Sequence, residues 1–338
     1  MQSTRLAQQQ FDRLDEVWRQ VKTRHSFYYQ IGPFTLCLCF ANQAFADGMT
    51  RAFHHLAIAA AKADLTICMI DTTQEDQQLP PLNWNLINYN GYRGYFDLPI
   101  FLHYFPSISA LSVLSVQENK AYYVVRSAAL LPWWVNGSPL QVILHAWFRE
   151  QGLQLTHTAA VGTETAAILM TGKGGSGKST TTLSCLAQGL YSLGEDYCLL
   201  KPGSEPHAYS VYQSAKLEKN TRTLFPDYER FIVNTEAAKT EKALMYYEDL
   251  FPGQIKKALP VRAIMSLSVG GGPLPLMQTQ DKQAALQDLM MSTLAQLPFY
   301  HPKTLEILKE VVDQVPCFRL ELGRNITANV DVIRDILK

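Results

Sequence analysis

Residues 1–140 alternate between helical and extended hydrophobic patterns. Apolar side chains recur at helical spacing over residues 6–21, which predicts an amphipathic helix. A second helix is expected at 49–61, and residues 74–94, rich in Pro, Asn, Gln and Asp, are expected to form a loop. Runs of strand-forming residues predict strands at 34–40, 65–70, 110–116 and 121–128. We therefore expect an N-terminal α+β domain over residues 1–140.

A helix predicted at residues 139–151 marks the expected domain boundary. Ser138 is its expected N-cap, Pro139 stands in its first turn, and Gly152 lies beyond its end. The second domain is accordingly expected over residues 141–338.

The second domain shows shorter apolar runs separated by helical patterns, so we expect it to be α/β. Its predicted strands are 155–161, 166–171, 263–269 and 317–322. Its predicted helices are 178–190, 282–295, 302–312 and 329–337. The charged and aromatic stretch 224–257 is expected to be helical only in parts.

Overall charge and cysteine content narrow the classes of partner. The 338 residues carry 30 basic and 30 acidic side chains, so no net field draws the chain to nucleic acid or to an acidic membrane. The six cysteines show no spacing typical of a zinc site, which predicts buried reduced thiols. Neither a secretory leader nor an apolar run long enough to span a bilayer is visible. We expect a cytoplasmic protein without a nucleic-acid or membrane partner.

One segment carries a specific chemical signal. Residues 172–179 read GKGGSGKS, a phosphate-binding loop, and they stand between a predicted strand and a predicted helix. In such a loop, backbone N–H groups point at phosphate oxygens, Lys178 reaches the β- and γ-phosphates, and the Ser179 hydroxyl holds Mg²⁺. The predicted nucleotide-binding residues are Gly172, Lys173, Gly174, Gly175, Ser176, Gly177, Lys178, Ser179 and Thr180.

Phosphoryl transfer also needs carboxylates near the loop. Glu195 and Asp196 follow Ser179 by sixteen and seventeen residues and lead into an apolar stretch, which would place both at a strand edge facing the phosphates. The alternative interpretation is a solvated turn. His157, beside a predicted strand, is a further candidate, although a lone histidine there usually makes a structural hydrogen bond.

Basic residues downstream could contact phosphate or substrate, but most scattered basic side chains are solvated. Position favours Lys242 and Arg262 slightly over the others. The remaining candidates are Lys201, Lys216 and Arg222.

From His145 to the end, the chain resembles the HPr kinase family, and within it the branch of HPr-kinase-like serine kinases. Four segments carry the likeness in the expected order: the strand with Leu155, His157 and Ala159; the loop 172–180; Glu195-Asp196; and the closing stretch 315–323. Residues 259–264 are also similar to a strand common in that branch. The chain before the predicted boundary shares the likeness only vaguely. The resemblance implies a P-loop core like that of HPr kinase and PEP carboxykinase.

The resemblance implies an ATP- and Mg²⁺-dependent kinase that phosphorylates a hydroxyl, in particular serine of a peptide or protein. Glu195 and Asp196 would supply the base and a metal contact, with Ser179 and Asp196 holding Mg²⁺, and His157 would line the site. The family usually has two aspartates where this chain has Glu-Asp, so the two carboxylates are assigned jointly. The family's signature for its protein partner is missing here, so HPr itself is not implied; a homo-oligomer is possible.

Two other functions stay open. Lys173 also fits the deviant loop of partition and septum-placement ATPases, which act as dimer switches. Those proteins normally begin with the loop, whereas here it starts only at Gly172, and Glu195-Asp196-Tyr197 lacks the form of their Asp-x-Asp-Pro-Gln strand. The other alternative is a non-catalytic nucleotide-binding scaffold, against which the intact Lys178 and acidic pair argue.

Overall fold

The chain divides into two compact units, Met1–Glu150 and Gln151–Lys338. The computed structural model describes residues 2–73, 93–95, 99–297 and 300–338, so most of the loop expected at 74–94 lies outside the described residues. Both units combine helices with β-sheets, which confirms the mixed α/β class. No helix in the described ranges is both long and apolar enough to cross a membrane.

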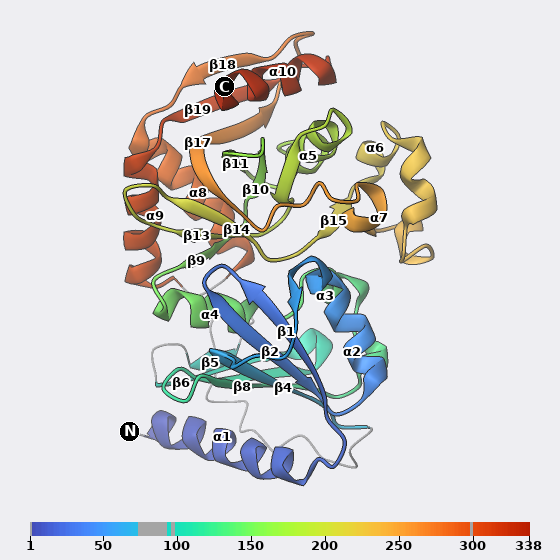
Figure 1. Cartoon of the computed structure of the whole chain (residues 1–338), viewed down its shortest axis with the longest axis vertical. Helices are drawn as coiled ribbons and strands as arrows, with labels where there is room; N and C mark the ends of the chain where they lie inside the picture. The colour runs from blue at the N-terminus through green and yellow to red at the C-terminus, as the bar shows by residue number, and fades with distance from the viewer. Residues whose placement is uncertain (1, 74–92, 96–98, 298–299) are drawn as a thin grey trace. The chain divides into compact units, whose positions relative to one another are not determined.

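An eight-stranded mixed sheet forms the first unit (Figure 1), in the order β3-β1-β2-β4-β8-β7-β6-β5. Its strands are β1 (His25–Ile31), β2 (Phe34–Phe40), β3 (Ala57–Ile58), β4 (Leu65–Asp71), β5 (Arg93–Tyr95), β6 (Ile100–Phe105), β7 (Ala110–Ser115) and β8 (Lys120–Val125). β4 runs parallel to both β2 and β8, and the other neighbours are antiparallel. The four predicted strands are present, while β1, β3, β5 and β6 were not predicted.

Helix α1 (Gln2–Gln20) confirms the predicted opening helix. Its apolar side chains, among them Phe11 and Trp18, pack on one face of the sheet against Tyr122 and its neighbours. The helix expected at 49–61 is wrong in its bounds. α2 (Gln43–Thr50) begins earlier because the Asn42 side chain caps it, accepting a hydrogen bond from the N–H of Phe45 at 2.8 Å.

The chain tightens into 3₁₀ turns at several points of the first unit and forms one more short helix. The 3₁₀ turns are Arg51–Leu56, Pro106–Ile108 and Ala128–Leu130, and the short helix is α3 (Trp133–Gly137).

Helix α4 (Gln141–Glu150) belongs to the first unit. The chain therefore divides after this helix, whereas the sequence analysis expected the boundary before it. The expected cap is wrong: Leu140 adopts a φ of 63°, which breaks the helical path and leaves Pro139 outside the helix. Trp147 anchors α4, with its ring edge-to-face on Phe34 and its Nε1 donating to the Asn119 side chain at 2.8 Å.

The second unit is built on a nine-stranded sheet with helices on both faces (Figure 1). Its strands are β9 (Gln154–Thr156), β10 (Ala159–Gly162), β11 (Ala167–Thr171), β12 (Tyr191–Gly194), β13 (Cys198–Lys201), β14 (His207–Ser210), β17 (Ala258–Val269), β18 (Leu276–Thr279) and β19 (Cys317–Leu322). β11, β17 and β19 are parallel neighbours, so their carboxyl ends meet at one edge. Ligands bind at such an edge in open α/β sheets.

Apolar side chains attach two helices to each face of this sheet. α5 (Lys178–Ala187) and α10 (Ile326–Leu337) cover one face, and α8 (Lys282–Gln296) and α9 (Pro302–Gln314) cover the other. All four helices were predicted, although α10 begins three residues earlier than expected.

One correction and one unpredicted strand pair in this unit matter for the site. The single strand expected at 155–161 is two strands, β9 and β10, which pair with different neighbours. The stretch 224–257 is helical only in parts, as expected, and it also contains β16 (Ala243–Tyr246), which pairs with the earlier strand β15 (Ser214–Leu217). Its other elements are α7 (Tyr247–Leu250) and the 3₁₀ turns Pro226–Phe231 and Ala237–Lys239, and α6 (Lys219–Arg222) lies just before it.

Replacing Trp147 by alanine should lower the free energy of unfolding of the first unit by about 3–5 kcal/mol, because it removes a buried ring and leaves a cavity. Trp147→Phe should cost less, since it keeps a ring and loses the bond to Asn119, worth about 1 kcal/mol. Urea unfolding followed by circular dichroism measures both. Leu130→Ala, at a side chain 78% exposed, is the control and should change little; equal effects at the two positions would contradict the packing of α4.

Candidate active site

The phosphate-binding loop connects β11 to α5 at the carboxyl edge of the parallel strands. Two of its glycines are required by the backbone. Gly172 has a φ of 144°, and a Cβ there would lie 2.6 Å from the Ser176 Oγ. Gly177, with a φ of 95°, is the residue before α5, and a Cβ there would overlap the Leu322 side chain. The loop therefore closes tightly and directs the first N–H groups of α5 toward its interior.

The interior of the loop has the features of an anion cradle. A Cβ placed on Gly174 or Gly175 would meet no heavy atom within 4 Å, so the backbone there is open to a ligand. The Ser176 hydroxyl is buried and has no hydrogen-bond partner among the described residues. A buried polar group without a partner is costly, and an anion bound in the loop would give it one.

Lys178 begins α5 and turns back over the loop. Its Nζ donates to the carbonyl oxygen of Gly172 at 2.6 Å, and the side chain is buried. Burial lowers the pKa of Lys178, while the charges of Asp196 and Glu195 act in the opposite direction. An ammonium held by one carbonyl can transfer to phosphate oxygens without unfolding the loop.

Glu195 is the carboxylate that meets the loop. The Ser179 hydroxyl donates to its Oε1, and the backbone N–H of Lys216 donates to its Oε2 at 3.1 Å. Burial and the adjacent charge of Asp196 raise the pKa of Glu195 to about 7 despite these bonds. Near neutral pH this carboxyl therefore keeps a proton part of the time.

Asp196 faces two basic side chains. Its Oδ1 lies 3.0 Å from the Nε2 of His157, and its Oδ2 accepts from the Nζ of Lys216 at 3.0 Å. Burial alone would raise the pKa of Asp196, but the charge of Lys216 and the bond to His157 outweigh it and hold the pKa far below the usual aspartate range. Asp196 is thus the ionised member of the pair.

His157 reaches this position because the chain leaves β9 there before it enters β10. The break turns the imidazole toward Asp196 on one side and toward α8 on the other. Its Nδ1 lies 2.9 Å from the Oγ of Ser292, which also lies 2.9 Å from the His157 carbonyl oxygen. Ser292 therefore fixes the orientation of the ring, a role that the sequence did not indicate.

Lys216 is the basic candidate that lies beside the acidic pair, although the sequence favoured Lys242 and Arg262 over it. It lies on β15, and only the pairing of β15 with β16 places it beside the acidic pair. The residues favoured instead are elsewhere: Lys242 pairs with Glu218 at 3.3 Å, although its charge also acts on the pKa of Lys178, and Arg262 is exposed on β17.

The other two basic candidates do not reach the acidic pair. Arg222 forms an ion pair with Glu229 at 2.8 Å, and Lys201 is exposed at the end of β13.

The described residues contain no group of three or more His, Cys, Asp or Glu side chains that could hold a metal by themselves. Mg²⁺ does not need such a group, since it is commonly held by one or two carboxylates together with substrate phosphates and water. The carboxylate that bonds to Ser179 in the structure is Glu195, whereas the sequence paired Ser179 with Asp196.

A cleft of about 560 Å³ opens beside the first half of the loop. Its polar lining includes His157, Lys173, Asp288 and Arg319. The Ser266 hydroxyl also lines it, buried and without a partner among the described residues. The cleft is therefore large enough to receive a hydroxyl-bearing group next to His157, which in turn contacts Asp196.

The raised pKa of Glu195 predicts a pH-dependent effect on stability. The ordinary pKa of a glutamate is 4.5, and that of folded Glu195 is about 7. Between these two pH values the folded protein keeps the proton that the unfolded chain has lost. The contribution of Glu195 to the free energy of unfolding therefore falls as the pH rises through this interval. Glu195→Gln removes this loss. The unfolding midpoint of the variant, relative to the parent protein, should therefore rise by a few degrees between pH 5 and pH 8 in scanning calorimetry.

The matched control is Glu164→Gln, at a side chain that is 72% exposed. Its midpoint difference from the parent protein should be the same at the two pH values. If the difference in unfolding midpoint between Glu195→Gln and the parent protein did not change with pH, the raised pKa of this buried carboxyl would be contradicted.

No protein-family model matches the chain, and no curated protein matches it in sequence. Among solved structures, the Hpr(Ser) kinase/phosphatase from Coxiella burnetii is similar to 54% of this chain and 95% of its own length. The sequence identity is 12% and the TM-score is 0.32, so the likeness is distant.

Proposed function

We propose that the second unit is a kinase that transfers the γ-phosphoryl group of ATP to a hydroxyl, with serine of a peptide or protein as the acceptor. The observation that carries this proposal is the hydrogen bond between Ser179 and Glu195, because it joins the phosphate-binding loop to the acidic pair. A solvated turn, the alternative for Glu195-Asp196, would leave these side chains in water, whereas Glu195 is 4% exposed.

The loop would hold the triphosphate through its N–H groups and through Lys178. On binding, the Lys178 Nζ exchanges the Gly172 carbonyl oxygen for oxygens of the β- and γ-phosphates. The open backbone at Gly174 and Gly175 and the unpartnered Ser176 hydroxyl fit such a ligand. No rearrangement of β11 or α5 is required.

Ser179 and Glu195 are the side chains that would hold Mg²⁺. Both present oxygen atoms, the ligands that this ion prefers, and they already lie in contact. The ion, when bound, neutralises charge on the phosphates during transfer. This assignment gives Glu195 the metal contact that the family resemblance suggested for Asp196.

Asp196 would then accept the proton of the attacking hydroxyl. Its low pKa makes it a weak base, but phosphoryl transfer passes through a loose transition state in which an orienting carboxylate suffices. Lys216 keeps Asp196 ionised, and His157 holds it from the side that faces the cleft. The acceptor hydroxyl enters through that cleft.

Product analysis tests the proposal against its two alternatives. The protein is incubated with γ-labelled ATP, Mg²⁺ and a library of serine-containing peptides, and in parallel with a cell extract. A kinase yields ADP and acid-stable label on the acceptor. ADP with free phosphate as the sole product would indicate an ATPase switch, and the absence of both products would indicate a non-catalytic scaffold.

Asp196→Asn should lower the rate of transfer about 100- to 10,000-fold, because it removes the proton acceptor. ATP affinity, measured by calorimetry, should stay within about threefold of the parent value, since Asp196 does not contact the loop. The double change Glu195→Gln with Asp196→Asn should abolish transfer. Unaltered turnover in the double variant would refute the assignment of the acidic pair.

Lys216→Met should slow transfer roughly 10- to 100-fold, because Asp196 loses the ion pair that keeps it charged. The Michaelis constant for ATP should change little. Lys201→Met provides the matched control, since Lys201 is an exposed lysine on the strand that follows the acidic pair. Similar losses in the two variants would show that Lys216 acts through overall charge and has no specific role.

A further inference from the structure

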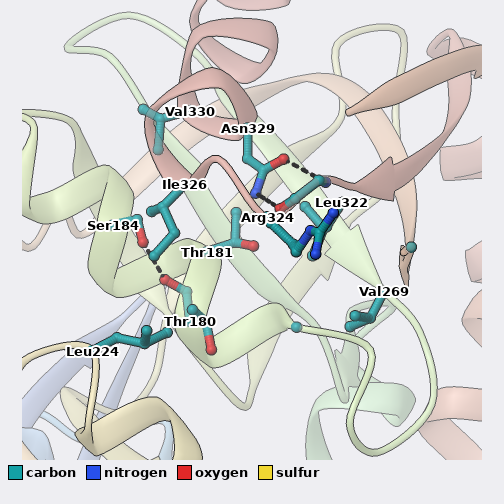
Figure 2. Close-up of a pocket in the computed structure, with 13 residues that line it drawn as sticks. Thr180, Thr181, Ser184, Leu224, Val269, Leu322, Arg324, Ile326, Asn329 and Val330 are labelled. Carbon is teal, nitrogen blue, oxygen red and sulfur yellow. Dashed lines mark hydrogen bonds between the residues drawn. The ribbon is translucent and has the colours of Figure 1, made fainter. Parts of the chain in front are cut away.

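The first unit contains a group of reactive side chains that the proposed function does not use. The cleft shown in Figure 2, by contrast, is lined by Thr180 and Leu322 and borders the phosphate-binding loop, so its chemistry belongs with that function. In the first unit, three cysteines lie on the adjacent strands β2 and β4. Two of them, Cys37 and Cys39, are in direct contact, with 3.3 Å between their Sγ atoms.

The geometry of β2 places the two thiols side by side. Side chains two residues apart on a strand point to the same face of the sheet. Ser26 lies opposite Cys39 on β1, with its Oγ 3.4 Å from the Cys39 Sγ, and Cys68 lies opposite Cys39 on β4. Cys39 is partly exposed, unlike the other five cysteines. Solvent can therefore reach Cys39, while Cys37 is buried next to it.

The two thiols hold their protons unequally. The hydrogen bond between them, with Cys37 as the donor, lowers the pKa of Cys39, and together with burial it raises the pKa of Cys37. The Ser26 hydroxyl and the charges of Arg24 and Lys120 lower the pKa of Cys39 further, while burial acts against them. The Arg24 guanidinium is fixed nearby because it donates to carbonyl oxygens around the end of α1. Cys39 is therefore the thiolate of the pair, and Cys37 is the thiol.

Other cysteines of the chain have the character of structural thiols. Cys68, Cys185 and Cys198 are 0% exposed, and burial raises the pKa of each. Such thiols pack as small apolar side chains and are inert. A partly exposed thiolate beside a second thiol is, in contrast, the arrangement typical of oxidisable cysteines.

We propose that Cys39 and Cys37 form an oxidisable dithiol site that reacts with a hydroperoxide. The Cys39 thiolate attacks the terminal oxygen of the hydroperoxide and the O–O bond breaks. The other oxygen takes a proton from water and leaves as an alcohol, or as water where the oxidant is hydrogen peroxide. Cys39 is then a sulfenic acid. This site does not depend on the proposed nucleotide binding.

Cys37 completes the reaction. Its sulfur attacks the Cys39 sulfur, so that an S–S bond forms while the S–O bond breaks, and the departing hydroxide takes the Cys37 proton and leaves as water. The two cysteines lose two electrons in total, and these electrons reduce the hydroperoxide.

The resulting disulfide should be easy to reverse. Residues two apart on a strand have Cα atoms about 6.6 Å apart, which is near the upper end of the range of about 4.4–6.8 Å that disulfides span. The bond can therefore close within β2, but it closes under strain, and strained disulfides are readily reduced by thiols.

The test is a map of all cysteines in the full chain after treatment with hydrogen peroxide. The reduced protein is freed of reductant, treated, unfolded in an alkylating reagent and analysed by peptide mass spectrometry. Cys37 and Cys39 should become joined to each other at least about tenfold faster than any other cysteine is lost, and dithiothreitol should restore both thiols. Equal rates at all six cysteines, a disulfide between Cys39 and Cys68, or no reaction at all would overturn the proposal.

Three variants separate the roles of the two thiols. Cys37→Ser should stop the reaction at the sulfenic acid, which dimedone then labels at Cys39. Cys39→Ser should slow oxidation of Cys37 at least about tenfold, because Cys37 is buried and keeps its proton. Cys68→Ala is the matched control, since Cys68 is the neighbour of Cys39 on β4, and it should leave disulfide formation unchanged. Undiminished oxidation of Cys37 without Cys39, or a disulfide that requires Cys68, would contradict the assignment.

Discussion

The site of the second unit depends on keeping two adjacent carboxylates, one buried and one partly buried, in one place. Glu195 and Asp196 repel each other in surroundings that disfavour charge, and the fold relieves this in two ways. Glu195 keeps a proton part of the time near neutral pH, while Asp196 stays ionised between Lys216 and His157. Such an arrangement costs stability unless every partner is present, so the elements that deliver those partners are constrained together.

Each partner comes from a different kind of element. Lys216 comes from a small hairpin outside the main sheet, His157 comes from the break between β9 and β10, and Ser179 comes from the first turn of α5. The parallel strands bring the loop to the sheet edge, where its first half borders the cleft that contains His157.

The sequence predicted the fold best where structure is decided locally. Helices α1, α5, α8 and α9 appeared close to the expected positions, and the hydrophobic periodicity of α1 and α9 is clear. Prediction failed where pairing between segments far apart in the sequence determines the secondary structure. The strand expected at 155–161 is divided, because its two halves pair with different strands, and β15 and β16 become strands only by pairing with each other across the intervening segment 218–242.

In the candidate site, too, some features follow from local sequence and others only from the tertiary structure. The phosphate-binding loop could be read from the sequence alone, because its shape follows from the backbone freedom of neighbouring glycines and from the helix that begins at Lys178. The sequence also indicated the acidic pair and His157 as candidates, but not their partners. Only the tertiary structure decided that Lys216 and not Lys242 bonds to Asp196, that Ser179 meets Glu195, and that Ser292 holds His157. These contacts join residues 16 to 135 positions apart, and sequence spacing does not determine which side chains long-range strand and helix packing brings together.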